Sequence, residues 1–174
     1  MMEVPNLSNE VSLSSAPRSA GDNTMTWSDR YLLGHAGMDN THRDFVACVA
    51  ALQTAEDAEL EVCLAAFEAH AVEHFEQERD AMQSTEFPAA QCHMDEHTAV
   101  LNSIHEVQEI VRKGGSVEVI RQLTHALVDW FPNHADYLDA SLAQWLVKRS
   151  HGGAPVVLRR RLTIDDTSAV SAGD

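Results

Sequence analysis

The stretch HMDEHTAVLNSIHEVQEIVRKGG, residues 93–115, decides the fold because it shows most clearly a pattern that the rest of the chain repeats. Its inward positions recur every three or four residues, which is the spacing of one face of an α-helix. These positions are His93, His97, Val100, Ile104, Val107 and Val111. The two glycines that follow are a fitting end for a helix. The stretch predicts a helix over about residues 89–113, with two histidines on its apolar face.

Three further segments carry the same helical pattern. The first covers about residues 40–54, with Asp39 or Asn40 as the expected N-cap. The others cover about residues 58–83 and 116–147. Four long helices with short connections, and no convincing strand, predict an all-α fold: an antiparallel up-down-up-down four-helix bundle.

Both ends of the chain depart from this pattern. Residues 1–26 are rich in Ser, Asn, Pro and Gly and show no apolar period, and residues 151–174 open with HGGAP and close with TSAVSAGD. Segments of this composition seldom bury enough apolar surface to fold. We therefore expect a flexible N-terminal arm at 1–26, the bundle at 27–150 and a flexible C-terminal tail at 151–174.

The charge of the chain restricts its partners. It has 12 Lys and Arg against 27 Asp and Glu, a formal net charge of −15. Nucleic acids and anionic membranes attract basic patches, so this balance argues against both. No apolar run approaches the ~20 residues of a membrane span, and the N-terminus lacks the basic start and apolar core of a secretory signal.

The cysteines do not form a disulfide framework. Cys48, Cys63 and Cys92 are an odd number without close pairs, which predicts a reduced, cytoplasmic setting. Cys92 lies beside His93, and we expect it to be an ordinary small helix residue and not a ligand.

Five polar residues fall on the apolar faces of the expected helices: His74, Glu78, His93, His97 and His134. Burying such groups without partners costs several kcal/mol. They could pair with each other, or the faces could be rotated slightly so that they meet water, which is the usual explanation for one isolated pair. The joint pattern over three helices, with His42 near the start of the first, instead indicates a metal site, because coordination stabilises a cluster of buried imidazoles.

Imidazole and carboxylate donors together suit Zn or Fe, whereas Mg and Ca prefer oxygen ligands. A ferritin-like di-iron site needs Glu three residues before His on two helices, and no His in this chain has a Glu there. A structural zinc site has four ligands and is usually rich in Cys, which does not fit this set. We expect His70, His105 and His125 at the surface or behind the ligands.

In chain order the motifs are MDNTH ending at His42, HFEQE at 74–78, HMDEH at 93–97 and HADYLD at 134–139. This set resembles the hemerythrins, in particular the bacterial single-domain ones. Their signature has one His at the start of the first helix, HxxxE on the second, HxxxH on the third and HxxxxD on the fourth. All seven positions are filled here in that order, and the similarity covers about residues 27–147.

The resemblance implies a non-haem di-iron centre, bridged by a solvent-derived oxo or hydroxo group. It assigns His93, His97 and His134 to one iron, His42 and His74 to the other, and Glu78 and Asp139 as bridges between the two. Counting donors leaves one coordination position open, on the iron of His42 and His74. In the family, that position binds O2 reversibly as a hydroperoxide when both irons are ferrous.

The implied function is therefore O2 storage, delivery or sensing by a protein that is not an enzyme, with O2 and small anions such as azide as ligands. Phe45, Trp130 and Phe131 are expected to line a dry pocket for O2, with plain core packing as the other explanation. Phe131 stands where Leu is common in the family, which affects how the pocket is gated.

A function of another class on the same scaffold is a di-iron enzyme with peroxidase, ferroxidase or NO-reducing activity. Carboxylate-rich sites better support high-valent iron. A set of five histidines and only two carboxylates therefore favours carrying O2 over using it for oxidation.

The spacing in HADYLD is unusual, because His134 and Asp139 are five residues apart. Five residues turn a regular α-helix through about 140°, so the two side chains would lie on different faces. Pro132, just before, removes a backbone donor and bends the helix. A widened π-type turn would bring such a pair closer together. We therefore predict a bend or π-type turn at about residues 131–139.

Overall fold

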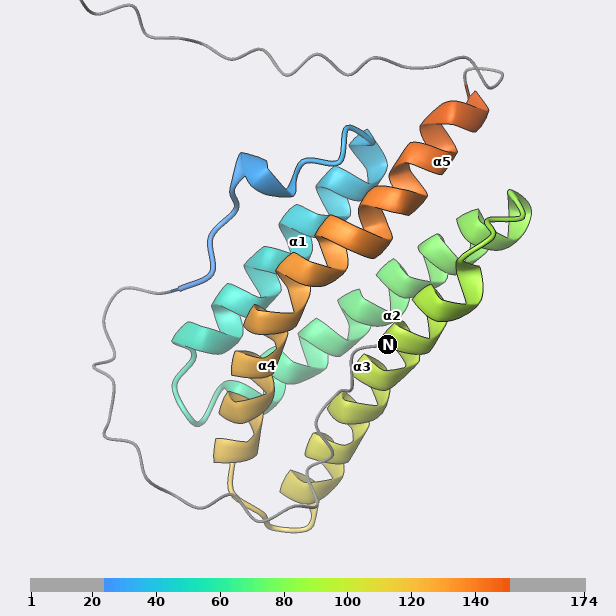
Figure 1. Ribbon diagram of the computed structural model, residues 1–174. Coiled ribbons are helices and arrows are strands. Elements are labelled where there is room, and N and C mark those ends of the chain that lie inside the picture. Colours follow the sequence, from blue (N-terminus) through green and yellow to red (C-terminus); the bar gives the residue numbers. More distant parts are fainter. Residues whose placement is uncertain (1–23, 151–174) are drawn as a thin grey trace, which may run out of the picture.

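The computed structural model describes residues 24–150, and every regular element in this range is helical (Figure 1). The elements are a short 3-10 helix η1 (Asp29–Tyr31), α1 (Ala36–Thr54), α2 (Leu60–Ser84), α3 (Ala90–Arg112), α4 (Glu118–His134), a π-helical turn η2 (Ala135–Asp139) and α5 (Ala140–Ser150). The last three follow one another without a break as a single long helix. Nearly all of the expected arm and the whole of the expected tail lie outside the described residues.

The long helices pack side by side as a bundle. Helix α1 lies against α2 and α4, and α3 also lies against α2 and α4 (Figure 1). The prediction of an all-α four-helix bundle is confirmed, while the alternation of helix directions stays a prediction from the short connections. None of the helices between residues 24 and 150 combines the length and apolar character that crossing a membrane requires.

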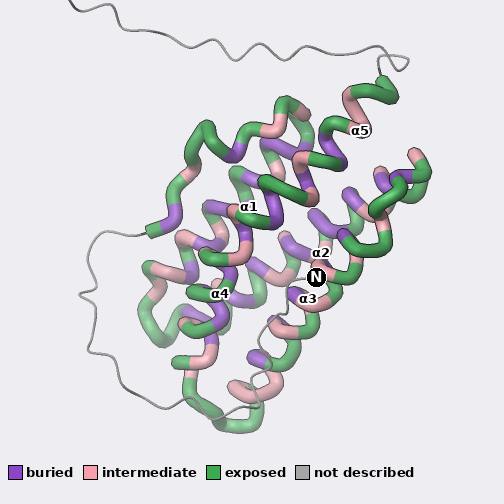
Figure 2. The backbone as a smooth tube through the Cα atoms, in the orientation of Figure 1, coloured by how far each residue is buried: buried purple, intermediate pink, exposed green. Residues whose placement is uncertain are grey.

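Buried residues recur along the inward faces of the helices (Figure 2). The apolar ones form two clusters. On α2, Glu78 lies between Phe75 of the larger cluster and Met82 of the smaller one. Each fully buried apolar side chain stabilises the fold by about 1.5–3 kcal/mol. The two clusters therefore offset the cost of burying the polar residues that lie between them.

The beginning of α1 differs from the prediction. The helix begins at Ala36, and its N-cap is His35, whose Nδ1 accepts a hydrogen bond from a backbone N–H of the first turn at 3.3 Å. The predicted caps, Asp39 and Asn40, are therefore wrong. Asp39 is buried inside the helix, and its Oδ1 accepts a hydrogen bond from Leu33 N at 2.7 Å. Histidine was not anticipated because Ser, Thr, Asp and Asn are the usual N-caps.

The end of α3 confirms the glycine signal. The N–H of Gly114 donates to the Val111 carbonyl at 2.8 Å, and that of Gly115 donates to the Ile110 carbonyl at 2.9 Å. Gly114 has φ 87°, a conformation that side chains disfavour. These bonds satisfy carbonyls of the last helical turn, which explains why the helix stops here.

The π-helical turn η2 confirms the prediction made from HADYLD. The N–H of Ala140 donates to the carbonyl of Ala135, five residues earlier, so the helix is locally wider. Pro132 lies just before this turn and has no N–H to donate. The wider turn rotates Asp139 onto the inward face, where both it and His134 are buried.

Candidate metal centre

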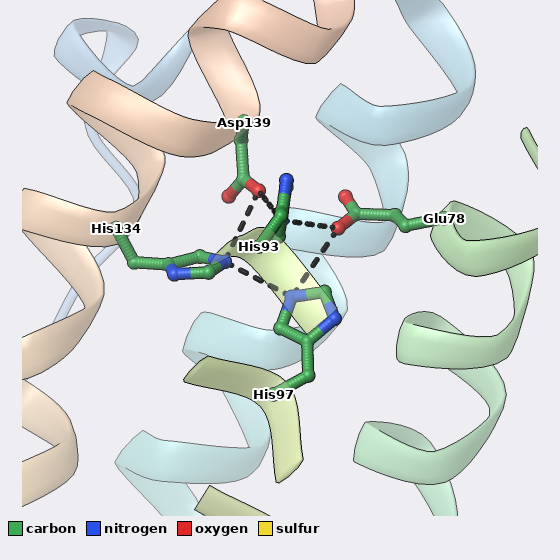
Figure 3. A group of neighbouring side chains, drawn as sticks. All are labelled: Glu78, His93, His97, His134 and Asp139. Carbon is green, nitrogen blue, oxygen red and sulfur yellow. Dashed lines mark hydrogen bonds and ion pairs between the residues drawn. The ribbon is translucent and has the colours of Figure 1, made fainter. Parts of the chain in front are cut away.

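Seven polar side chains meet inside the bundle, and they are the seven that the sequence motifs predicted. Each is at most 4% exposed, and we call them the polar cluster: His42, His74, Glu78, His93, His97, His134 and Asp139. Every long helix contributes, and the pairs four residues apart in α2 and α3 share one helical face. In Figure 3, five of the side chains point toward one another: Glu78, His93, His97, His134 and Asp139.

The polar cluster contains two overlapping groups that could hold a metal ion. One consists of Glu78, His93, His97, His134 and Asp139, and the other of His42, His74 and Glu78. Within each group the donor atoms all lie within 4.8 Å of one another. The division matches the one implied by the family resemblance, with three histidines on one side and two on the other.

Glu78 lies between the two groups. Its Oε1 is 3.2 Å from the Nε2 atom of His74, and its Oε2 is 3.1 Å from that of His93 and 3.5 Å from that of His97. One carboxylate thus directs one oxygen to each group.

Asp139 divides its oxygens in the same way. Its Oδ2 is 3.1 Å from Nε2 of His42, while its Oδ1 is 3.1 Å from Nε2 of His93 and 3.2 Å from Nε2 of His134. Both carboxylates therefore span the two histidine groups, and all five histidines direct Nε2 toward them.

The donor atoms fit metal ions better than they fit each other. Both ring nitrogens of His42 and of His93, Oε2 of Glu78 and both oxygens of Asp139 are buried without a hydrogen bond, although carboxylate and imidazole atoms lie about 3.1 Å apart. Metal–ligand bonds of about 2.0–2.1 Å put neighbouring donors of one ion roughly 3 Å apart. Buried polar atoms without partners are costly, and metal coordination removes that cost.

The carboxylates of the polar cluster are ionised. Burial and the nearby charge of Asp139 oppose ionisation of Glu78, but the hydrogen bond with His74 and the close ring nitrogen of His93 outweigh them and lower the pKa of Glu78 to about 2. Burial also opposes ionisation of Asp139, yet the charge of His134, whose Nε2 lies 3.2 Å from Oδ1, holds the pKa of Asp139 well below the usual range. Glu78 and Asp139 therefore offer anionic donors to a cation.

The histidines of the three-histidine group differ from one another. Burial alone would lower the pKa of His134, but the charge of Asp139 in close contact raises it to about 9. His97 has its pKa lowered to about 2, first by burial and then by the charge of His134. A metal ion that binds here must therefore displace a proton from His134.

The outward ring nitrogens show a further asymmetry. The buried Nδ1 atoms of four cluster histidines have no hydrogen-bond partner among the described residues: His42, His74, His93 and His97. Nδ1 of His134 instead donates to Glu96 Oε2 at 3.1 Å, and Nε1 of Trp130 donates to the same oxygen at 3.3 Å. Glu96 was missed at the sequence level, although it directly precedes His97 in HMDEH and offers an acid beside the motif.

Aromatic rings cover both groups. Phe131 meets His42 edge-on with 5.3 Å between ring centroids, and Phe45 stacks on Phe131 at 4.6 Å. Trp130 stacks on His134 at 4.2 Å, and therefore lies over the three-histidine group. Phe75, which the motifs did not single out, stacks on His97 in the same group at 3.8 Å, with its ring plane 8° from that of His97.

A cleft of about 120 Å³ leads to the polar cluster from the other side. It opens between α1, α2 and α5, with Met38, Ala81 and Leu142 among its walls, and reaches His74 and Glu78. This cleft has room for several water molecules. The polar cluster thus has a packed aromatic side and a side that approaches the surface.

The remaining candidates lie outside the polar cluster, as expected. His105 is 58% exposed and pairs with Glu68 at 3.0 Å, His125 is exposed, and His70 is half-buried. Cys92 is exposed, and no disulfide links the three cysteines, all of which lie in the described part of the chain.

Comparisons with known proteins agree with this site. Residues 33–146 match the family described as the hemerythrin HHE cation binding domain. A curated bacteriohemerythrin of Ralstonia nicotianae is 34% identical over 123 residues, which cover 71% of this chain and 89% of that protein. No solved structure matches the chain. Together with the buried cluster of histidines and carboxylates, these matches show that the chain belongs to the hemerythrin family.

Proposed function

We propose that this protein binds O2 reversibly at a non-haem di-iron centre, for storage, delivery or sensing. Two iron ions would be held by five histidines and bridged by Glu78 and Asp139, together with an oxo or hydroxo group. The observation that carries the proposal is that each carboxylate directs one oxygen to each histidine group. A single-ion site has no use for that arrangement.

The unequal histidine groups determine where O2 would bind. His93, His97 and His134, with the two carboxylates and the bridging group, would supply a full set of donors to one iron, whereas His42 and His74 would supply one donor fewer to the other. The open position would belong to the iron of His42 and His74. At this iron, the cofactor would supply reversible electron transfer to O2.

The protein contributes a dry wall beside the two-histidine group. Phe45 and Phe131 are 0% and 1% exposed, and their rings lie against His42 and His74. Such a wall keeps water from a bound ligand and slows irreversible oxidation of the iron. Trp130, also expected in the pocket, lies mainly over His134, and we propose that it closes the opposite edge of the wall.

The donor set supports a carrier better than an enzyme. Five imidazoles and two carboxylates stabilise high-valent iron less well than a carboxylate-rich set, and the relative from Ralstonia is named a bacteriohemerythrin. A cytoplasmic setting belongs to the same proposal and rests on the odd number of cysteines, three in the whole chain.

The test is to add O2 to the anaerobic diferrous protein and follow the visible spectrum. We expect a long-lived absorption band that disappears when O2 is removed and returns on a second addition. Direct conversion to the diferric form, with turnover of peroxide, ferrous iron or NO, would contradict the O2 carrier and support the di-iron enzyme.

A further inference from the structure

Glu96 is a residue of α3 that contacts the polar cluster without belonging to it. Its Oε2 accepts hydrogen bonds from Nδ1 of His134 at 3.1 Å and from Nε1 of Trp130 at 3.3 Å. Its side chain is 37% exposed, so it lies between the buried site and solvent. A single carboxylate thus contacts a cluster histidine and the aromatic ring stacked on that histidine.

The contact is specific to one histidine. The outward nitrogens of the other four are buried and have no hydrogen-bond partner among residues 24–150. Among the described residues, His134 is therefore the one cluster histidine whose outward nitrogen contacts a carboxylate.

An anion behind a metal-bound imidazole has two physical effects. It fixes the tautomer and orientation of the ring, and it raises the basicity of the nitrogen that faces the metal. A more basic nitrogen donates more electron density, which favours the more highly charged metal ion. Both effects would act on the three-histidine iron and not directly on the iron that binds O2.

We propose that Glu96 is a positioning residue that holds the His134 ring and Trp130 in place and makes His134 the strongest nitrogen donor of the five. This inference rests on the proposed di-iron centre. It gives the two irons different tasks: the three-histidine iron is held tightly and favoured in its ferric state, while the two-histidine iron exchanges its ligand. The negative charge of Glu96 would then lower the reduction potential of the three-histidine iron, although Glu96 binds no metal.

The test compares Glu96→Gln and Glu96→Ala with Asp95→Asn. Asp95 is the adjacent acid on α3. It is exposed, and its Oδ1 accepts a hydrogen bond from Nε2 of Gln91 at 2.7 Å. Asp95→Asn therefore removes the same charge from nearly the same place without disturbing the His134 ring. All variants are loaded with iron as full-length chains and kept anaerobic.

Two measurements separate charge from hydrogen bonding. The first is the rate of iron release from the diferrous protein to a chelator, which we expect to rise by at least about tenfold in Glu96→Ala and by less in Glu96→Gln, where the amide oxygen still accepts from the ring. The second is the midpoint potential of the centre, which should rise in both Glu96 variants by more than in Asp95→Asn. A purely structural role for Glu96 would leave the potential unchanged.

Potentials of the Glu96 variants equal to that of Asp95→Asn, in a protein that still binds two irons, would overturn the inference and leave the proposed function intact. A wild-type protein that binds no iron pair would overturn the proposed function itself.

Discussion

The two sides of the polar cluster share their carboxylates but not their surroundings. The three-histidine side has His93, His97 and His134, stacked Trp130 and Phe75, and the Glu96 carboxylate behind it. The two-histidine side has fewer donors, faces Phe45 and Phe131, and borders a cleft that reaches His74 and Glu78.

In the proposed di-iron centre, this difference would let one site both hold a cofactor and bind a ligand. The donors, stacked rings and outer carboxylate of one side would hold an ion that exchanges no ligand. On the other side, the smaller donor set beside an apolar wall would leave a position for a small molecule. Glu78 and Asp139 would couple the two ions.

The largest expected effect comes from removing a bridge. Asp139→Ala deletes oxygens that lie 3.1 Å from His42 and 3.1 Å from His93, so both sides lose a ligand at once. We expect iron per chain to fall from two to less than one. Asp136→Ala, in the same turn but exposed, is the matched control and should keep two irons by elemental analysis. Equal iron contents in the two variants would mean that Asp139 does not bridge.

Removing single histidines should distinguish the two sides. His42→Ala leaves one imidazole on the two-histidine side, whereas His97→Ala leaves two on the other. We expect chelators to remove one iron from His42→Ala at least about tenfold faster than from His97→Ala, because the poorer donor set loses a larger share of its ligands. Similar rates of iron release from the two variants would contradict the claim that the two sides hold their irons with unequal donor sets.

A rise in pH should lower the stability of the metal-free protein and raise its affinity for iron, both through His134. In the metal-free protein, the pKa of His134 is raised from 6.5 to about 9. Its contribution to the free energy of unfolding, on the order of 3 kcal/mol, is therefore fully present below pH 6.5 and lost as the pH rises through about 9.

Iron affinity should change the other way over the same window. Binding displaces the His134 proton, so affinity should rise by up to about tenfold per pH unit until the pH reaches that pKa. Denaturant titrations of the metal-free protein and iron titrations, both from pH 6.5 to 9, measure the two trends. Parallel trends would show that His134 does not carry the proton that iron displaces.

The smallest effect is expected at the aromatic wall. Phe131→Leu removes part of a ring that is 1% exposed and contacts His42, which should speed azide binding several-fold and cost about 1–2 kcal/mol of stability. Phe67→Leu changes an equally buried ring that meets Phe45 edge-on and lies two turns before His74 in α2, and should cost similar stability without changing azide kinetics. Stopped-flow absorbance measures the rates, and equal rates in both variants would assign Phe131 to core packing alone.

Helical periodicity predicted the bundle well because the inward faces of long amphipathic helices carry apolar residues every three or four positions. It also explained the pairs four residues apart, such as His74 with Glu78. It could not place His134 and Asp139 together, since a regular helix would separate them, and the π-helical turn was inferred from that conflict. The His35 cap escaped prediction because histidine is an unusual cap.

The contacts that Glu96 and Phe75 make with the cluster histidines could not be predicted from the sequence, for a different physical reason. Glu96 accepts from His134 and Trp130, which belong to another helix 34 to 38 residues farther along the chain. Phe75 stacks on His97 across a helix–helix contact. Such pairings depend on how two helices rotate against each other, which the periodicity of one helix does not fix.

The most direct measurement is the structure of the iron-loaded diferric protein with azide. We predict two irons per chain, bridged by Glu78 and Asp139, with azide bound only to the iron of His42 and His74. A single iron, or azide on the iron of His93, His97 and His134, would contradict the division of the site into a closed side and an open side.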